Sequence, residues 1–240
     1  MSDEIVRENA TNFDTSPPVE VGMYDSSMRL FFAAYEPMFT MAYSALRSAL
    51  RDDANVLIVG AGTGAEIVEF TKRNDSWKLT GVDPSADMLA IARKRVCEYE
   101  LNDRVTLVQG YTSDLPEEPL YDAATCILVM HFLEDDGAKL SILEDISRRL
   151  KPGALLVLVD GFGDTSTPGF GNKFAAWKQF PVAMGMDRDF VEDRAQSILM
   201  QRIKFVPENR IFSLLAETGF VHPERFFTSF FYGGWMAFKG

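Results

Sequence analysis

Residues 56–66 read Val56-Leu-Ile-Val-Gly60-Ala61-Gly62-Thr63-Gly64-Ala65-Glu66, and this stretch decides the fold. Its four apolar residues predict a buried strand, and the glycines predict a tight turn that leads into a helix. Glycines are needed there because the backbone bends sharply and a ligand lies against it with no Cβ in the way. Free N–H groups at the start of the helix would face that ligand, so we expect a nucleotide-like cofactor.

An acidic residue, Asp83, ends the short predicted strand Lys78-Leu-Thr-Gly-Val-Asp83. A carboxylate about 20 residues past the glycines can accept both hydroxyls of a ribose. The spacing Gly60-x-Gly62-x-x-Ala65 also satisfies the dinucleotide fingerprint. These residues alone therefore leave a nicotinamide cofactor open beside other nucleotide-like cofactors.

Four segments, in order along the chain, resemble the successive motifs of the class I S-adenosylmethionine-dependent methyltransferases. They are Val56–Ala65, Gly81–Leu89, Tyr121–Leu128 and Leu150–Leu158. The resemblance covers residues 50–160 well and the C-terminal hairpin moderately. It implies S-adenosyl-L-methionine as cofactor and S-adenosyl-L-homocysteine as product. It also implies an α/β fold, a Rossmann-like seven-stranded, mostly parallel sheet with an antiparallel last strand and helices on both faces.

The composition is that of one globular domain, since the chain has 240 residues of which 47% are hydrophobic. We find no apolar run near the ~18 residues of a membrane span and no signal-peptide pattern, and so expect a cytoplasmic protein with no membrane segment. A formal charge of −11 disfavours direct nucleic-acid binding, which points to a small-molecule substrate. Cys97 and Cys126 should be buried and reduced, and no Cys/His spacing indicates a metal site. A homodimer is left open.

We expect a single domain over residues 1–240 with three added segments. Residues 1–20 are polar with two adjacent prolines, which predicts a mobile arm. Residues 21–50 carry apolar side chains at helical spacing, which predicts N-terminal helices. Residues 161–206 begin with a glycine-rich run and continue with aromatic and methionine residues. They predict a helical insert after strand 5, either a cap that completes the core or a lid that selects the substrate.

Between these segments, strands alternate with helices, which predicts a parallel sheet with right-handed crossovers. Beyond the first two strands, we expect strands over 105–109, 123–130 and 154–159 and helices over 140–150 and 208–217. The C-terminus predicts a hairpin, with strands over 225–231 and 235–239 and Gly233-Gly234 at the turn. An antiparallel final strand is typical of the methyltransferase sheet, and dehydrogenase folds generally lack it.

The resemblance also places the cofactor, with its amino-acid end at the glycine loop, its ribose at Asp83 and its adenine near Met88. An acid that binds the adenine amino group often follows the third-strand glycine in the resembled family. Here Gly110 is followed by Tyr111, so we expect either Tyr111 to cover the ring or Asp114 to replace that acid. The expected cofactor-binding residues are Gly60, Ala61, Gly62, Thr63, Gly64, Asp83, Pro84, Met88, Gly110, Tyr111, Thr112 and Leu128.

Acceptor-site candidates come from the end of strand 4 and from the region after strand 5. His131 could be a general base near neutral pH, with a structural histidine as the alternative. Asp160 and Asp164 could bind a substrate amine or hydroxyl, with solvated loop acids as the alternative. Trp177 and Arg194 belong to the insert and would contact the substrate if the insert is a lid.

The predicted function is methyl transfer from S-adenosyl-L-methionine to a small-molecule nucleophile by in-line displacement, which needs positioning more than a catalytic triad. Within the superfamily, Met130–Glu134, Ala216–Phe220 and Phe226–Lys239 look like the carboxy-S-adenosylmethionine synthase branch, whose enzymes modify the cofactor for tRNA wobble-uridine modification. Such an enzyme needs a cationic side chain for the added carboxylate, and Arg194 is the candidate. A cofactor-binding protein without turnover is a third alternative.

Overall fold

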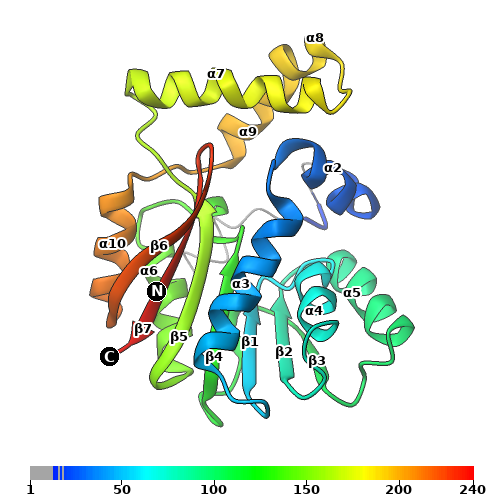
Figure 1. The fold of residues 1–240 in the computed structure, drawn as a ribbon, viewed down its shortest axis with the longest axis vertical. Coiled ribbons are helices and arrows are strands. Elements are labelled where there is room, and N and C mark those ends of the chain that lie inside the picture. The colour runs from blue at the N-terminus through cyan, green and yellow to red at the C-terminus, as the bar shows by residue number, and fades with distance from the viewer. Residues whose placement is uncertain (1–12, 16, 18) are drawn as a thin grey trace.

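The structure is a computed structural model that describes residues 13–15, 17 and 19–240 (Figure 1). Its centre is a seven-stranded sheet with the order β3-β2-β1-β4-β5-β7-β6. The strands are β1 (Asn55–Val59), β2 (Lys78–Asp83), β3 (Val105–Gln109), β4 (Tyr121–Ile127), β5 (Leu150–Gly161), β6 (Phe220–Ser229) and β7 (Tyr232–Lys239). Strand β7 runs antiparallel to β5 and β6, and the other neighbours are parallel. The predicted Rossmann-like sheet is confirmed.

Helices cover both faces of the sheet. On one face lie α3 (Tyr35–Ala49), α4 (Ala65–Thr71) and α5 (Ala86–Glu98), and on the other lie α6 (Ala138–Arg148) and α10 (Glu208–Glu217). Side chains of β1 alternate between the two cores, because successive residues of a strand point to opposite faces. Both cores are apolar, which explains why the sequence of this strand is an uninterrupted apolar run.

A helical layer lies at the carboxyl ends of the parallel strands (Figure 1). It combines an N-terminal part, η1 (Val21–Met23) and α2 (Tyr24–Phe31), with an insert after β5. The insert contains α7 (Pro168–Ala183), α8 (Arg188–Phe190), the π-helix η4 (Val191–Ala195) and α9 (Gln196–Arg202). The Trp177 indole N–H donates to the carbonyl of Phe31 at 2.7 Å, which fastens α7 to α2.

Several predicted element boundaries differ from the structure: β6 (Phe220–Ser229) and β7 (Tyr232–Lys239) begin earlier than the predicted 225 and 235, and the bounds of β4, α6 and β5 also shift. The expected strand over 123–130 ends at Ile127, because Leu128 adopts a φ of 59° and a 3₁₀ turn, η3 (Met130–Phe132), follows. The expected helix over 140–150 ends at Arg148. Leu150 instead opens β5 and pairs with Tyr121, so β5 begins four residues earlier than predicted.

The predicted turn of the C-terminal hairpin is wrong. Gly233 and Gly234 lie inside β7, and the chain turns at Phe230 and Phe231. A Cβ at Gly233 would come within 2.6 Å of the Trp235 ring, so this glycine makes room for an aromatic side chain within the strand. The helix predicted over 208–217 has those bounds in the structure.

The two cysteines differ in exposure. Cys126 is buried as predicted, whereas Cys97 is exposed. Position 97 follows the buried Val96 by one residue on α5, and one residue turns a helix by about 100°, away from the core. No described helix is both long and apolar enough to cross a bilayer.

Candidate functional site

The loop between β1 and α4 is bent at three glycines with positive φ, namely 71° at Gly60, 50° at Gly62 and 77° at Gly64. A Cβ at Gly60 would lie 2.2 Å from Cγ2 of Val129, and one at Gly64 would lie 3.1 Å from Cβ of Ala92. At Gly62 the nearest atom would be 3.8 Å away. Gly60 and Gly64 therefore let neighbouring side chains approach, while Gly62 leaves space at the loop.

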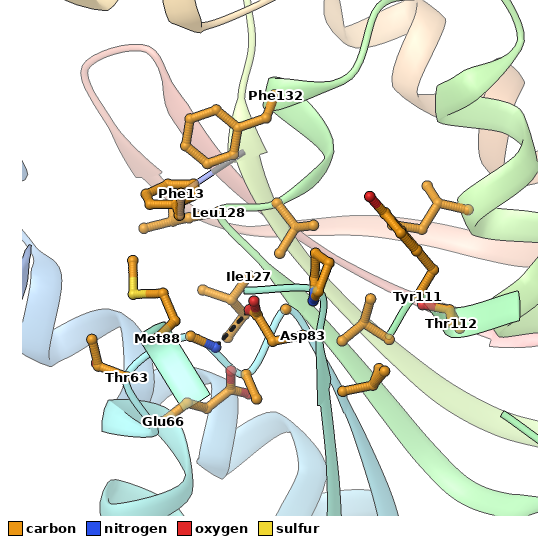
Figure 2. Close-up of a pocket in the computed structure, with 18 of the residues that line it drawn as sticks. Phe13, Thr63, Glu66, Asp83, Met88, Tyr111, Thr112, Ile127, Leu128 and Phe132 are labelled. Atoms are coloured by element: carbon orange, nitrogen blue, oxygen red, sulfur yellow. Dashed lines mark hydrogen bonds between the residues drawn. The ribbon is translucent and has the colours of Figure 1, made fainter. Parts of the chain in front are cut away.

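Asp83 ends β2 beside this loop, and Figure 2 shows its carboxylate against the loop backbone. Its Oδ2 accepts the N–H of Gly62 at 2.8 Å, and its Oδ1 accepts the N–H of Ser85 at 2.9 Å. Burial raises the pKa of Asp83 to about 6, although both hydrogen bonds oppose the rise. Each oxygen keeps a further lone pair, so the fixed carboxylate can accept two ligand hydroxyls.

A pocket opens at this carboxylate and brings together the predicted cofactor residues (Figure 2). All of them line the pocket except Gly64. Tyr111 is on the pocket wall, whereas Asp114 accepts the N–H of Tyr111 at 2.9 Å and does not line it. Leu128 reaches the wall in a left-handed conformation that is strained for a leucine.

Sequence reasoning missed two acids, Glu66 and Asp145, and five aromatic residues of the wall. The aromatic residues are Phe13, Tyr24, Tyr35, Phe39 and Phe132. Of the two missed acids, Glu66 lies in the first turn of α4 and is only 6% exposed. Burial raises its pKa to about 7. Its place two residues after the last loop glycine was the available signal, because the start of that helix must lie near the ligand.

Asp25 of α2 ties the N-terminal helices to the glycine loop. It pairs with Arg95 of α5 at 2.6 Å and accepts the hydroxyl of Tyr35 at 2.8 Å. The hydroxyl of Thr63, in the loop, lies 2.9 Å from the same carboxylate, and Arg95 also donates to Thr63. The buried carboxylate therefore joins α2, α3, α5 and the loop in one network.

Phe13 and Asp14 belong to the segment predicted to be a mobile arm, of which residues 1–12 lie outside the described part of the chain. Phe13 lines the pocket and makes edge contacts with the rings of Tyr24 and Phe132, at centroid distances of 5.8 and 5.4 Å. Asp14 accepts the Ser85 hydroxyl at 2.5 Å and the Ala86 N–H at 3.0 Å. It thus caps α5, and this capping lowers its pKa.

His131 and Asp160 form a buried pair beside the pocket. His131 Nδ1 lies 2.5 Å from Asp160 Oδ1, a contact that places a proton between them, so we assign Nδ1 as the donor. The same oxygen accepts the backbone N–H groups of His131 at 2.9 Å and Gly161 at 3.0 Å. Neither side chain lines the pocket, and the ring of Phe132, which does, lies 4.4 Å from the imidazole.

The other predicted acceptor residues are also outside the pocket wall. Trp177 is 1% exposed in the aromatic core between α7 and α2. Asp164 is exposed and accepts the N–H and hydroxyl of Ser166, its own neighbour in a turn. Arg194 is exposed on the π-helix. The structure therefore does not bring these three residues together.

The charged side chains of the pocket wall, among the described residues, are all carboxylates. Glu66, Asp83 and Asp145 line it, and no lysine, arginine or histidine does so among the described residues. The described residues also contain no cluster of three His, Cys, Asp or Glu side chains that could hold a metal ion. Such a wall favours a ligand with positive charge.

The family comparison agrees with this geometry. Residues 57–156 match the family model of the methyltransferase domain, a range that runs from β1 into β5 and contains the glycine loop and Asp83. The strand order and the antiparallel β7 complete the fold. Over residues 57–156 the chain is therefore similar to methyltransferase domains, and its fold is shared by a protein assigned to the S-adenosyl-L-methionine-dependent methyltransferases.

Two curated relatives are named for different activities. The demethylmenaquinone methyltransferase of Lactiplantibacillus plantarum is 34% identical over 113 residues, 46% of this chain and 46% of the relative. The carboxy-S-adenosyl-L-methionine synthase of Colwellia psychrerythraea is 30% identical over 112 residues, 45% of this chain and 44% of the relative. The matched stretch spans less than half of the length of these relatives.

Solved structures share the fold over more of the chain. A protein of Methanococcus maripaludis assigned to the S-adenosyl-L-methionine-dependent methyltransferases has a TM-score of 0.64 at 22% identity, over 96% of this chain and 95% of that chain. An O-methyltransferase family protein of Burkholderia thailandensis has a TM-score of 0.65 at 13% identity, over 92% and 59%. At these identities the similarity is one of fold.

Proposed function

We propose that this protein transfers the methyl group of S-adenosyl-L-methionine to a small acceptor that is neutral or cationic and partly apolar. The observation that carries the proposal is the pocket itself. It starts at the glycine loop, holds a fixed carboxylate at its centre and continues to aromatic rings without a basic side chain among its described residues.

The residues present fit the cofactor. Asp83 offers two oxygens for the ribose hydroxyls, the space at Gly62 admits a ligand close to the backbone, and Met88 and Tyr111 supply apolar surface for a purine. When bound, S-adenosyl-L-methionine supplies a methyl group on a positively charged sulfur. Transfer forms one bond from the acceptor atom to that carbon and breaks the carbon–sulfur bond, whose electron pair stays on sulfur.

The chain contributes position and exclusion of water. The loop and Asp83 fix one end of the ligand, and Phe13, Tyr24 and Phe132 form an apolar wall beyond it. Holding two reactants in line can supply much of the rate acceleration of such a step. The aromatic wall favours an acceptor with an apolar or planar part.

The main alternative is a carboxy-S-adenosyl-L-methionine synthase, the activity for which one relative is named. That product carries an added carboxylate, and an anion in a buried site needs a cationic partner. Arg194, the candidate from the sequence, is exposed and outside the pocket, and the described pocket residues offer no other cation. The charge of the wall therefore supports methyl transfer over this alternative.

His131 is proposed as a base only for acceptors that must lose a proton. Its Nδ1 is engaged by Asp160, so Nε2 is the nitrogen that would accept the proton. If His131→Gln lowers kcat more than 100-fold while S-adenosyl-L-homocysteine binds normally, His131 acts as the base. Unchanged kcat with lower thermal stability would instead assign the pair to anchoring η3 on β5.

The experiment combines calorimetry with mass spectrometry. We expect micromolar binding of S-adenosyl-L-methionine or S-adenosyl-L-homocysteine and no binding of NAD(H). With cofactor labelled in its methyl group, label in a product extracted from a small-molecule panel supports transfer. A mass gain on the cofactor in the presence of prephenate would support the synthase, and binding without turnover would support a cofactor-binding protein.

The acceptor charge has a separate test. Asp160→Asn and Asp164→Asn are compared with Arg194→Ala in the same turnover assay. Loss of turnover in the arginine variant alone would indicate an anionic acceptor or an anionic modified cofactor and would overturn the proposed charge preference. Unchanged turnover in that variant supports it.

A further inference from the structure

The turn at residues 13–15 is attached to the start of α5 through Asp14. Its Oδ1 accepts the Ser85 hydroxyl at 2.5 Å and the N–H of Asp87 at 3.2 Å, and its Oδ2 accepts the N–H of Ala86 at 3.0 Å. The positive end of the helix favours a carboxylate at this place. The Asp14 side chain is exposed, so water competes for the same hydrogen bonds and the contact can open.

Helix α5 has an N-cap of its own beside this contact. Ser85 is the residue at that position, and its hydroxyl oxygen accepts the N–H of Met88 at 3.1 Å. The backbone N–H of Ser85 donates to Asp83 Oδ1 at 2.9 Å, so the start of the helix is joined to the carboxylate proposed for the ribose. The contact with Asp14 therefore attaches the N-terminal segment directly beside the proposed ribose site.

Phe13, the residue before Asp14, lies on the pocket wall. Its ring meets the rings of Tyr24 and Phe132 at centroid distances of 5.8 and 5.4 Å and at interplanar angles of 78° and 81°. Figure 2 shows Phe13 between Phe132 and Met88 in that view. Edge-to-face contacts of this kind fix a geometry but are individually weak. Phe13 thus joins two parts of the wall that are distant in the sequence.

The two attachments of this turn lie on either side of the glycine loop. Helix α5 follows β2 and η3 follows β4, and β1 lies between β2 and β4 in the sheet. A segment fixed at α5 and at η3 therefore spans the carboxyl end of β1, where the glycine loop begins. Ligands of open α/β sheets bind outside this end of the strands.

We propose that residues 13–15 are a strap that closes over the bound cofactor, and that Asp14 is the latch that sets the rate of ligand exchange. This inference rests on the proposed function, because the ligand is the cofactor of that reaction. Phe13 covers the ligand, and opening requires the Asp14 carboxylate to leave the start of α5. Because the contacts that close the strap are made within the chain, the latch acts on entry as well as on release.

A latch and a ligand contact have different kinetic effects. A weaker latch raises the open fraction of both the free and the bound protein, so the association and dissociation rate constants increase together and Kd changes little. Loss of a ligand contact mainly raises the dissociation rate constant, and Kd rises with it. The two rate constants therefore separate these roles.

The test is surface plasmon resonance at pH 7.5 with S-adenosyl-L-homocysteine as the probe. Asp14→Ala should raise both rate constants about threefold or more and leave Kd within about twofold, because the helix start loses its carboxylate. Asp87→Asn is the matched control. It removes a charge from the first turn of the same helix, keeps the backbone N–H that Asp14 accepts, and should change neither rate constant.

A second variant tests the cover itself. Phe13→Ala should raise both rate constants and also weaken the affinity about threefold or more, because the ring that joins the wall and covers the ligand is lost. Phe190→Ala, at an exposed residue of α8 outside the pocket, is the control and should change neither quantity. Unchanged rate constants in Phe13→Ala would overturn the strap.

Asp14→Ala can overturn the latch in two ways. A faster dissociation at an unchanged association rate constant would show that Asp14 stabilises only the bound state. Unchanged rate constants, together with a lower stability in urea, would leave Asp14 as a cap of α5 only. Failure of the wild-type protein to bind S-adenosyl-L-homocysteine would contradict the proposed function instead.

Discussion

Asp83 is held in place before any ligand binds, and this preorganisation makes it a strong test of the cofactor site. Its two oxygens already accept the N–H groups of Gly62 and Ser85. The loop and the carboxylate therefore support each other, and the remaining lone pairs face the pocket. Loss of the side chain should remove both the ribose contacts and the support of the loop.

Asp83→Ala is expected to lower the affinity for S-adenosyl-L-homocysteine by about 1.5–3 kcal/mol, or roughly 10- to 150-fold, because hydrogen bonds to a charged group are lost. Calorimetry at pH 7.5 measures the change. Asp103→Ala, an exposed site that removes the same charge, is the control. An effect no larger than that of the control would show that Asp83 does not hold the ribose.

Glu66 should also make the free protein sensitive to pH. Its pKa of about 7 in the folded state lies above the ordinary value of 4.5, so the native state holds the proton more tightly than the unfolded state. Its contribution to stability is therefore complete below about pH 4.5 and is lost as the pH rises through 7. The ionised carboxylate is therefore unfavourable in this buried position.

Glu66→Gln should raise the free energy of unfolding by about 2–3 kcal/mol at pH 8 and change it little at pH 4.5, because glutamine cannot ionise. Urea unfolding of the ligand-free protein at the two pH values measures this difference. A variant that is less stable than the wild type at pH 8 would show that the ionised carboxylate has a partner within the protein.

At the scale of elements, the buried network of Asp25 positions α2 against the glycine loop. The carboxylate contacts Arg95, Tyr35 and Thr63, which come from α5, α3 and the loop. Tyr24, next in the chain, lines the pocket. Docking of α2 and the shape of the pocket are therefore coupled through one side chain.

Asp25→Asn should destabilise the fold by about 1–3 kcal/mol, because Arg95 loses its charged partner in a part-buried site. Hydrogen exchange should show loss of protection in α2 and the loop. Glu36→Gln, which breaks an exposed pair with Arg29, is the control and should cost less than about 1 kcal/mol. Equal effects of the two variants would contradict a role for the network in docking α2.

At the scale of the whole molecule, the insert contacts two elements that contribute residues to the pocket wall, α2 through Trp177 and η3 through the Lys204 N–H, which donates to the carbonyl of His131 at 2.7 Å. Trp177 of α7 is bonded to Phe31 of α2, whereas no residue of the insert lines the pocket. The insert is a helical layer packed on the core, and its closing motion remains a prediction. Such a motion would reach the pocket through α2 and η3.

Binding of S-adenosyl-L-homocysteine should increase the hydrogen-exchange protection of residues 24–31 and, to a smaller extent, of residues 168–183, because the two helices share the Trp177 contact. The central strands, already buried, serve as the internal reference. Unchanged protection of both helices with saturating ligand would leave the insert as a structural cap only.

The sequence by itself determined the sheet and the cofactor loop of this protein. Strand β1, the glycine turn and Asp83 are coded by neighbouring residues, since burial on both faces requires an apolar run and a tight turn requires glycine. The helix over 208–217 was predicted with its observed bounds for the same local reason. These features depend on contacts between residues that are close in the sequence or on the repeated alternation of strand and helix.

Only the tertiary structure decided the rest of the pocket. Phe13 reaches the wall from the N-terminal segment, Glu66 is buried on the wall beside the glycine loop, and Gly233 lies in a strand because the Trp235 ring needs its space. Each of these outcomes depends on side chains that are distant in sequence or on the way rings pack across a strand. The local conformational preferences of residues do not specify such contacts. The charge and shape of the pocket wall are therefore decided by tertiary packing.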